Sequence, residues 1–333
     1  MKAIWLIQLG TPLEPSPRAV RKYLKEFLMD PRVLELNFFL RYFLVHFMIV
    51  PFRSAKSAEA YKKIWTKEGS PLLVHSRKLQ EDLQQELGSD VLVRLSMTYG
   101  NPSIAQTWKE LNKIELKHLV VVPLFPQYSS STTGSVMERI MMEMRSSKFF
   151  PKLSFISSFF NNANFIQAFV EQGLQSNVKD YDHVLFSFHG LPVKSLLSTS
   201  PKCFTPNCCK DKDSNLTICY RAQCLETARL IQESLSLDPE KTSLSFQSRL
   251  GKQAWIQPYT DLHVKELASK GVQRLAVFCP SFVSDCLETL EEIGIRLKRS
   301  FLDAGGKELH LVPSLNDSPH WVKSLKSLFL EAQ

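Results

Sequence analysis

The feature that most constrains the fold is a regular alternation of short apolar runs with amphipathic segments along the chain. Short runs rich in Val, Ile, Leu and Phe are typical of buried parallel strands. We expect strands at 3–9, 91–97, 118–124, 183–188, 243–247, 273–279 and 308–312. The amphipathic segments predict helices at 17–28, 55–66, 75–87, 103–112, 135–145, 163–175, 221–235, 261–270, 285–302 and 319–330.

Alternating strands and helices imply parallel sheets that are covered by helices on both faces. Because 333 residues exceed what one small core organises, we predict an α/β protein with two doubly wound, Rossmann-like lobes. The turn region at 146–152 places the boundary near residue 150, which gives lobes at 1–150 and 151–333. A nucleotide-binding function lacks its main signature, since no GxGxxG or Walker loop is present.

The chain is basic, with 41 Lys and Arg against 33 Asp and Glu. This balance suits acidic partners such as an anionic membrane surface or a small molecule that carries carboxylates. The basic residues are scattered and form no recognisable binding motif, so we expect no nucleic-acid partner. No cleavable signal follows the apolar start at 3–7, which predicts a cytoplasmic protein whose cysteines are thiols or ligands.

Polar residues follow three of the expected strands, where open α/β sheets bind their ligands. His189 ends the strand at 183–188 and begins a Gly-x-Pro turn, a position that suits a histidine facing a cleft. The hydroxyl-rich loop at 125–134 is suited either to hold an anion or to cap the next helix. Asp285, Glu288 and Glu292 share one face of the helix expected at 285–302, either as a solvated face or as a site that binds cations or moves protons.

Nine motifs occur in the order in which they occur in the ferrochelatase family, and the chain resembles that family from about residue 3 to about residue 325. The pattern is similar to that of Gram-negative bacterial members. The histidine turn and the acidic helix are the most specific motifs in combination. The nine are Leu9–Pro12, Tyr23–Arg32, Gly69–Leu72, Tyr99–Pro102, Phe125–Gly134, Phe188–Pro192, Phe246–Arg249, Trp255–Asp261 and Ser284–Glu292.

The resemblance implies a class II chelatase with a porphyrin cleft between its lobes. Such a lyase inserts Fe²⁺ into protoporphyrin IX, releases two protons and forms protohaem, the last step of haem biosynthesis. His189 would face the ring as proton acceptor or metal ligand, with Glu288 across the macrocycle. Asp285 and Glu292 would continue a path for protons or iron. The residues expected to line the bent porphyrin are Tyr128, Ser130, Tyr99, Arg32 and Phe282.

Two positions depart from patterns found in the family. Thr98 stands where members often have arginine, so the propionate or metal contacts that the resemblance implies there do not carry over to Thr98. Cys286 stands where animal members have histidine, although some bacterial members also have cysteine there. We therefore do not interpret Cys286 as a loss of activity.

The most apolar stretch lies at about 36–53 and is here called the lip segment. It is shorter than the ~20 apolar residues of a transmembrane helix and contains Arg41 and His46. It is suited to a core helix; the resemblance instead implies the lip of the porphyrin cleft, with peripheral contact to the inner membrane. Arg32, Arg41 and Arg53 are then candidates to bind propionates or lipid phosphates. The sequence leaves monomer and homodimer open.

Five cysteines lie in a polar, lysine-rich insertion at about 200–224, and this density in a cytoplasmic protein indicates a metal or iron–sulfur site. Zinc bound by four thiolates is the general option, and an unligated redox-sensitive loop is another. A subset of ferrochelatases carries a 2Fe-2S cluster, some with ligands in an internal segment, so the resemblance favours that cofactor with four of the five as ligands. Cys203, Cys219 and Cys224 are expected to bind, and Cys208 and Cys209 to supply one ligand between them.

Other functions stay open at this point. One alternative is a coproporphyrin III ferrochelatase, and another is a chelatase that loads cobalt or nickel into a related tetrapyrrole. A third is a non-catalytic haem-handling or Fe–S protein with the same fold, which would tolerate the loss of His189 or Glu288.

Overall fold

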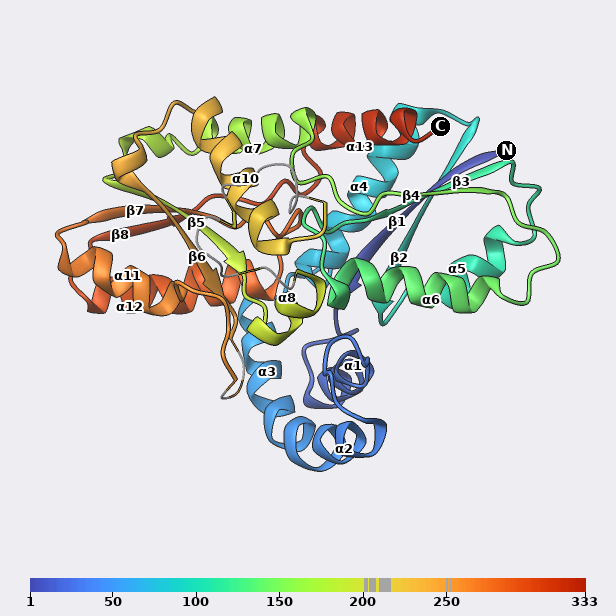
Figure 1. Cartoon of the computed structure of the whole chain (residues 1–333), viewed down its shortest axis with the longest axis horizontal. Coiled ribbons are helices and arrows are strands. Elements are labelled where there is room, and N and C mark those ends of the chain that lie inside the picture. The colour runs from blue at the N-terminus through green and yellow to red at the C-terminus, as the bar shows by residue number, and fades with distance from the viewer. Residues whose placement is uncertain (201–202, 204–207, 210–216, 250, 252) are drawn as a thin grey trace. The chain divides into compact units, whose positions relative to one another are not determined.

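The computed structural model describes residues 1–200, 203, 208–209, 217–249, 251 and 253–333 (Figure 1). The parts of the cysteine-rich insertion at 201–202, 204–207 and 210–216 therefore lie outside the described residues. The chain divides into two units, one of residues 1–125, 130–158 and 322–333 and one of residues 126–129 and 159–321.

The first unit holds a four-stranded parallel sheet in the order β2-β1-β3-β4. The central strand β1 is buried over most of its length, as the apolar run at its start predicts. The elements of this unit are β1 (Lys2–Gly10), α1 (Pro17–Leu28), α2 (Phe38–Phe43), the π-helix η1 (Leu44–Ile49), α3 (Val50–Ile64), α4 (Pro71–Leu87), β2 (Val91–Tyr99), α5 (Ile104–Leu111), β3 (His118–Pro123), the π-helix η2 (Ser130–Gly134), α6 (Ser135–Met144) and β4 (Lys152–Phe155).

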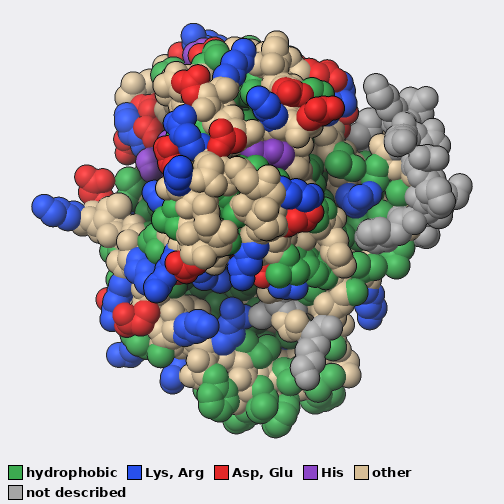
Figure 2. Space-filling view, turned by 90° about the vertical axis from the view of Figure 1, so that its left-hand side faces the viewer, with side chains coloured by type: hydrophobic (Ala, Val, Ile, Leu, Met, Phe, Trp, Pro, Cys, Tyr) green, Lys and Arg blue, Asp and Glu red, His purple; other side chains and the backbone are tan. Residues whose placement is uncertain are grey.

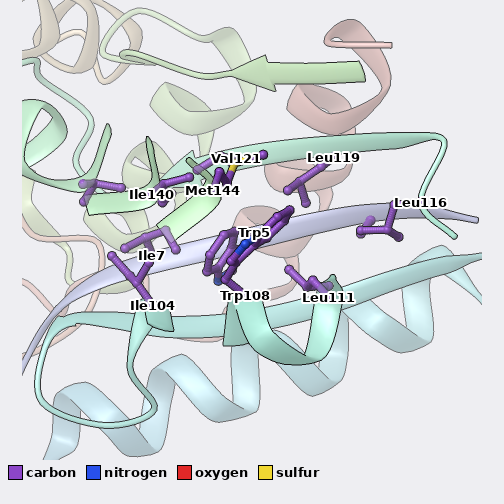
Figure 3. Close-up of a cluster of buried hydrophobic side chains, with 12 residues drawn as sticks. Trp5, Ile7, Ile104, Trp108, Leu111, Leu116, Leu119, Val121, Ile140 and Met144 are labelled. Carbon is purple, nitrogen blue, oxygen red and sulfur yellow. The ribbon is translucent and has the colours of Figure 1, made fainter. Parts of the chain in front are cut away.

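Alternate residues of β1 and β3 pack against α5 and α6 to form the core on one face of this sheet (Figure 3). Trp5 and Trp108 lie at its centre with their rings stacked and their centroids 6.4 Å apart. The indole Nε1 of Trp5 donates to Ser96 Oγ at 2.8 Å, so the one polar atom of this buried ring is satisfied. The side chains that alternate along the strands thus meet the apolar faces of α5 and α6.

The second unit repeats the plan with a parallel sheet in the order β6-β5-β7-β8. One face packs on α11, the π-helix η5 and α12, where Ile293, Leu297 and Phe301 are buried. The elements are α7 (Ala163–Gln175), the 3₁₀-helix η3 (Val178–Asp180), β5 (His183–His189), α8 (Val193–Thr199), α10 (Tyr220–Ser234), the 3₁₀-helix η4 (Pro239–Lys241), β6 (Thr242–Gln247), α11 (Thr260–Ser269), β7 (Arg274–Phe278), η5 (Leu287–Leu297), α12 (Lys298–Asp303) and β8 (Glu308–Leu311). The last helix, α13 (Pro319–Glu331), begins in this unit and ends in the first.

The change of unit falls at residue 158 rather than near residue 150 as the turn region predicts. The reason is β4, a short edge strand that pairs in parallel with β3 and so keeps residues 152–155 in the first sheet. Its residues Lys-Leu-Ser-Phe alternate polar and apolar side chains and are exposed or half-buried in the structure. The sequence of β4 therefore lacks the apolar run that marks the other strands. Residues 322–333 also belong to the first unit. The predicted lobe at 151–333 instead places them in the second.

The lip segment forms a continuous helical stretch through α2, η1 and α3, and its apolar side chains face outward. Phe39 is 83% exposed and Phe52 is 75% exposed. Among the described residues, one stretch, Phe38–Ile64, is long and apolar enough to cross a membrane by length and composition alone. In Figure 2 apolar side chains gather at the lower end of the molecule, where Figure 1 places α2. A core helix, one of the two interpretations of this stretch, is therefore wrong for these side chains.

Arg41 is the exception within the lip segment because its side chain is buried. Its Nη1 donates to the main-chain oxygen of Leu36 at 2.5 Å and of Leu34 at 3.4 Å. The guanidinium therefore holds the turn that precedes α2 and does not reach out to an anion in this structure. Arg53 is exposed and keeps the expected character.

His183 at the start of β5 provides a test of stability against pH. Burial, and then the nearby His263, lowers the pKa of His183 from 6.5 to about 4. As the pH falls, the unfolded chain therefore takes up the proton at a higher pH than the folded chain does. The contribution of neutral His183 to the free energy of unfolding is fully present above pH 6.5 and is lost progressively down to about pH 4. Between pH 7.5 and 4.5 we expect wild type to lose about 1–2 kcal/mol more than His183→Gln, a value reduced for partial hydration of the ring. Urea unfolding of both proteins at the two pH values measures it, and equal losses would contradict it.

Candidate active site

His189 is the last residue of β5, at the carboxyl end of the second sheet. Its Nδ1 lies 2.6 Å from the main-chain oxygen of Gly190. Since a carbonyl oxygen only accepts, Nδ1 carries the proton, and in the neutral imidazole Nε2 keeps its lone pair. The Phe282 ring stands edge-on to the imidazole, with centroids 6.1 Å apart. His189 is thus held in the tautomer that accepts a proton or a metal at Nε2.

Gly190 allows the histidine turn to approach the end of β6 very closely. Its N–H donates to the main-chain oxygen of Gln247 at 2.8 Å. A Cβ at Gly190 would lie 2.7 Å from that same oxygen, so only glycine fits here. The Gln247 side chain continues the connection, because its Nε2 donates to the main-chain oxygen of Glu288 at 2.9 Å. One residue therefore ties the histidine turn to the acidic helix.

The acidic helix is η5, a π-helix that begins at Leu287, whereas the sequence predicts an α-helix from 285. π-Helical turns are rare in proteins, and those that occur are frequently found at functional sites. Glu288 and Glu292 both lie on η5 and are half-buried. The structure brings both His189 and Glu288 within electrostatic range of Glu292, since both groups act on the titration of Glu292.

Glu292 is fixed by Ser248, whose N–H and Oγ donate to its two carboxylate oxygens at 2.9 and 2.6 Å. Ser248 makes both bonds with φ at 66°, a left-handed conformation that few non-glycine residues adopt. Burial raises the pKa of Glu292, and the neighbouring charge of Glu288 adds to this. The bonds from Ser248 and the charge of Arg296 oppose the shift. A carboxyl group with a raised pKa is better able to hold a proton in transit.

Asp285 precedes η5, and its carboxylate is already occupied. Oδ1 accepts from the Thr289 hydroxyl at 2.9 Å, and Oδ2 accepts from the side-chain amide of Asn316 at 2.8 Å. The main-chain N–H of Asp285 donates back to Asn316 Oδ1 at 2.8 Å. These contacts make Asp285 the residue that fixes the start of the helix, while its predicted role in a proton or metal path stays a prediction.

Arg32 and Ser130 lie together in the first unit. Arg32 Nη1 donates to Ser130 Oγ at 2.9 Å, and its Nε pairs with Glu138 at 2.6 Å. Tyr99 is fully buried, and its hydroxyl donates to Asp30 at 3.0 Å, so it packs inside this unit. Tyr128 belongs to the second unit, where its main-chain N–H donates to Gln223 Oε1 at 2.7 Å.

Comparisons with known proteins agree on the class of this fold. The chain aligns over its full length with SirB from Bacillus subtilis with Fe³⁺, at a TM-score of 0.57 and 13% identity over 96% of that chain. The sirohydrochlorin chelatase SirB from Bacillus subtilis subspecies spizizenii in complex with cobalt matches at a TM-score of 0.51 and 12% identity, over all of this chain and 95% of that one. At such low identity these matches show the fold, which is that of the class II chelatases.

Sequence comparison identifies the family. The family model described as Ferrochelatase matches residues 1–333. A ferrochelatase of Coxiella burnetii (strain Dugway 5J108-111) is 45% identical over 330 residues, covering 98% of this chain and 92% of the relative. A ferrochelatase of Legionella pneumophila (strain Lens) is 43% identical over 330 residues, covering 99% of both chains. The chain belongs to the ferrochelatase family, and the predicted family is confirmed.

Proposed function

We propose that this chain is a lyase that inserts Fe²⁺ into protoporphyrin IX, with His189 as the proton acceptor and Glu288 as its acidic partner across the macrocycle. The observation that carries this assignment of roles is the tautomer of His189, fixed by the contact between Nδ1 and Gly190 O. Insertion releases two pyrrole protons, so a site for it needs an acceptor with an available lone pair and a route outward. Nε2 of His189 provides the acceptor.

Glu288 and Glu292 provide the route for the protons. Glu292 lies one turn further along η5, and its raised pKa suits a group that alternates between charged and protonated states. Arg296, with 63% of its side chain exposed, lies 3.8 Å from Glu292 and so marks the solvent end of the path. Oxygen and nitrogen ligands hold Fe²⁺ only moderately, which suits a metal ion that is passed on as substrate. Phe282, Tyr128, Ser130 and Arg32 are the proposed porphyrin contacts.

An anaerobic insertion assay tests this function. Purified protein is mixed with ferrous iron and either protoporphyrin IX or coproporphyrin III, and haem formation is followed by absorbance. We expect turnover with protoporphyrin, and turnover only with coproporphyrin would overturn the substrate assignment. Parallel reactions with Co²⁺ and Ni²⁺ test the alternative metals, and no turnover with any pair would contradict catalysis.

We also propose that the lip segment binds the surface of an anionic membrane. Its exposed phenylalanines stand beside basic side chains from the same unit, since α1 packs on α3 and exposes Arg18, Arg21 and Lys22. An apolar face next to Lys and Arg is the pattern of a helix that lies in the interface plane. Arg53 and Lys56 add positive charge on α3 itself.

Light scattering on the purified protein measures the oligomeric state and distinguishes a monomer from a homodimer.

Replacing Phe39 and Phe52 by Glu is expected to weaken binding to phosphatidylglycerol vesicles by at least about 10-fold. Each buried phenylalanine contributes about 1.5–3 kcal/mol, and 1.4 kcal/mol is a factor of ten. The matched control replaces Phe149 and Phe150, which are 61% and 56% exposed in the same unit but outside the lip segment. Sedimentation with vesicles measures both variants. Equal binding of the two double variants would contradict the membrane contact.

The five cysteines from Cys203 to Cys224, the last of which lies on α10, are candidates to hold a 2Fe-2S cluster, and their donor chemistry fits it. The Cys203 thiol donates a hydrogen bond to the sulfur of Cys219. This bond lowers the pKa of Cys219 to about 6, although burial opposes the shift. Arg221 Nη1 lies 2.8 Å from Cys209 Sγ, and Cys208 Sγ lies 3.7 Å from it. Among the described residues no three His, Cys, Asp or Glu side chains are arranged to bind a metal ion, so binding requires these thiols to move together. When bound, such a cluster supplies a one-electron redox centre.

We expect protein purified without oxygen to show visible charge-transfer absorption and to contain about two iron atoms and two sulfides per chain. Cys203→Ser and Cys219→Ser are expected to abolish both signals, because the loss of a thiolate ligand removes a bond to iron. Cys279→Ser is the control, since Cys279 is buried directly after β7 and lies outside the insertion at 200–224 in the sequence. Protein that contains zinc but no sulfide would favour a zinc site. Protein that contains neither iron nor zinc would favour a loop of unligated thiols.

A further inference from the structure

Tyr220 begins α10 directly after Cys219, and its side chain is buried against the histidine turn. The phenol Oη donates to the main-chain oxygen of His189 at 2.7 Å. It also lies 3.1 Å from Ser281 Oγ, and the N–H of His189 donates to that serine oxygen at 3.4 Å. Because the single phenol proton is used on His189, Ser281 donates its own proton to Tyr220. The Tyr220 and Ser281 hydroxyls therefore hold both main-chain polar groups of His189.

This arrangement controls the imidazole as well as the backbone. Nδ1 bonds to Gly190 O, which belongs to the next peptide, so a net change in the backbone torsions on either side of the His189–Gly190 peptide shifts the acceptor of Nδ1 and with it the ring. Gly190 is already fixed on its other side by its bond to Gln247. The Tyr220 hydroxyl fixes the remaining side of that peptide. Removal of the hydroxyl leaves a buried carbonyl to find a new donor, which favours local movement.

We propose that Tyr220 is a positioning residue that sets the orientation of His189 Nε2. The same turn of α10 carries Gln223, which holds the main chain of Tyr128 at 2.7 Å. Cys219 directly precedes Tyr220 and Cys224 lies one turn later on α10, so one turn of helix joins the cysteines, the histidine turn and the Tyr128 loop. The kinetic consequence rests on the proposed function, while the structural consequence does not.

Tyr220→Phe keeps the buried ring and removes only the hydroxyl. We expect kcat for iron insertion to fall about 10-fold while KM for the porphyrin changes less than about two-fold, since the proton acceptor is misplaced and substrate contacts remain. Tyr181→Phe is the matched control, because its Oη donates to Glu308 at 3.0 Å in the same unit. It is expected to keep kcat within about two-fold. Equal kcat for the two variants would overturn the proposal.

A second measurement does not depend on activity. In porphyrin-free protein labelled with ¹⁵N-histidine, we expect His189 to show the Nδ1-protonated tautomer, with its signals assigned by their loss in His189→Gln. Tyr220→Phe is expected to show a mixture of tautomers, whereas Tyr181→Phe keeps one. An unchanged His189 tautomer in Tyr220→Phe would overturn the positioning role even if the chain inserts iron. If wild type inserts no iron, the proposed function fails, and the tautomers still decide this inference.

Discussion

His189→Gln is expected to lower kcat for iron insertion by about 10²–10⁴-fold, the range that a positioned general base contributes. Glutamine keeps a polar side chain of similar reach, but it has no atom that accepts a proton near neutral pH. Since Nδ1 of His189 already bonds to Gly190 O, it is the loss of Nε2 that removes the acceptor. Steady-state anaerobic assays with ferrous iron and protoporphyrin IX measure the effect.

The control for this result is His263→Gln in the same unit. His263 is a largely buried histidine on α11 whose Nε2 bonds to Ser243 Oγ at 2.9 Å. We expect its kcat to stay within about two-fold of wild type. Porphyrin binding, followed by fluorescence quenching, and thermal unfolding show whether each variant folds and binds. A His189→Gln enzyme that binds porphyrin and keeps a third of its kcat would show that another group accepts the protons.

Glu288→Gln is expected to lower kcat by about 10²-fold or more with little change in porphyrin affinity. The amide keeps the size of the side chain but carries neither a negative charge toward Fe²⁺ nor an exchangeable carboxyl proton. The main chain of Glu288 is held by Gln247, so the variant should keep the geometry of the helix. The measurement is kcat at saturating iron, together with the dependence of the rate on iron concentration.

Glu291→Gln is the matched control because Glu291 lies on the same π-helix and pairs with Arg296 at 3.3 Å. Its carboxylate is buried, so we expect a loss of stability with kcat within about three-fold of wild type. Such a result separates a carboxylate that acts on the substrate from one that stabilises η5. Equal losses of kcat in Glu288→Gln and Glu291→Gln would contradict the role of Glu288.

Much of the fold was predictable because its signals are local. The helix expected at 17–28 matches α1 to the residue, since Ser16 caps it and Pro17 begins it. The helix expected at 163–175 matches α7, which Asn162 caps with bonds to two main-chain N–H groups. The edge strand β4 was not predictable, because its residues are half-buried and its pairing with β3 depends on a residue far away in the chain.

The candidate site divides in the same way. His189 and the acidic residues could be predicted from residue type and position at strand ends. Tyr220 and Ser248 could not, because a hydroxyl that holds His189 from 31 positions away leaves no mark in the sequence pattern. The motif at 246–249 was a signal for Ser248, but only the structure shows its left-handed backbone and its two bonds to Glu292.

The sequence by itself determined the α/β class, most of the elements and the family, since these follow from the periodicity of apolar residues and from the order of motifs. Only the tertiary structure decided that η5 begins at Leu287 as a π-helix, that Asp285 is occupied by Thr289 and Asn316, and that Arg41 turns inward. The physical reason is that hydrogen bonds between distant segments select among local conformations that differ little in free energy. Such partners are close only in the folded chain.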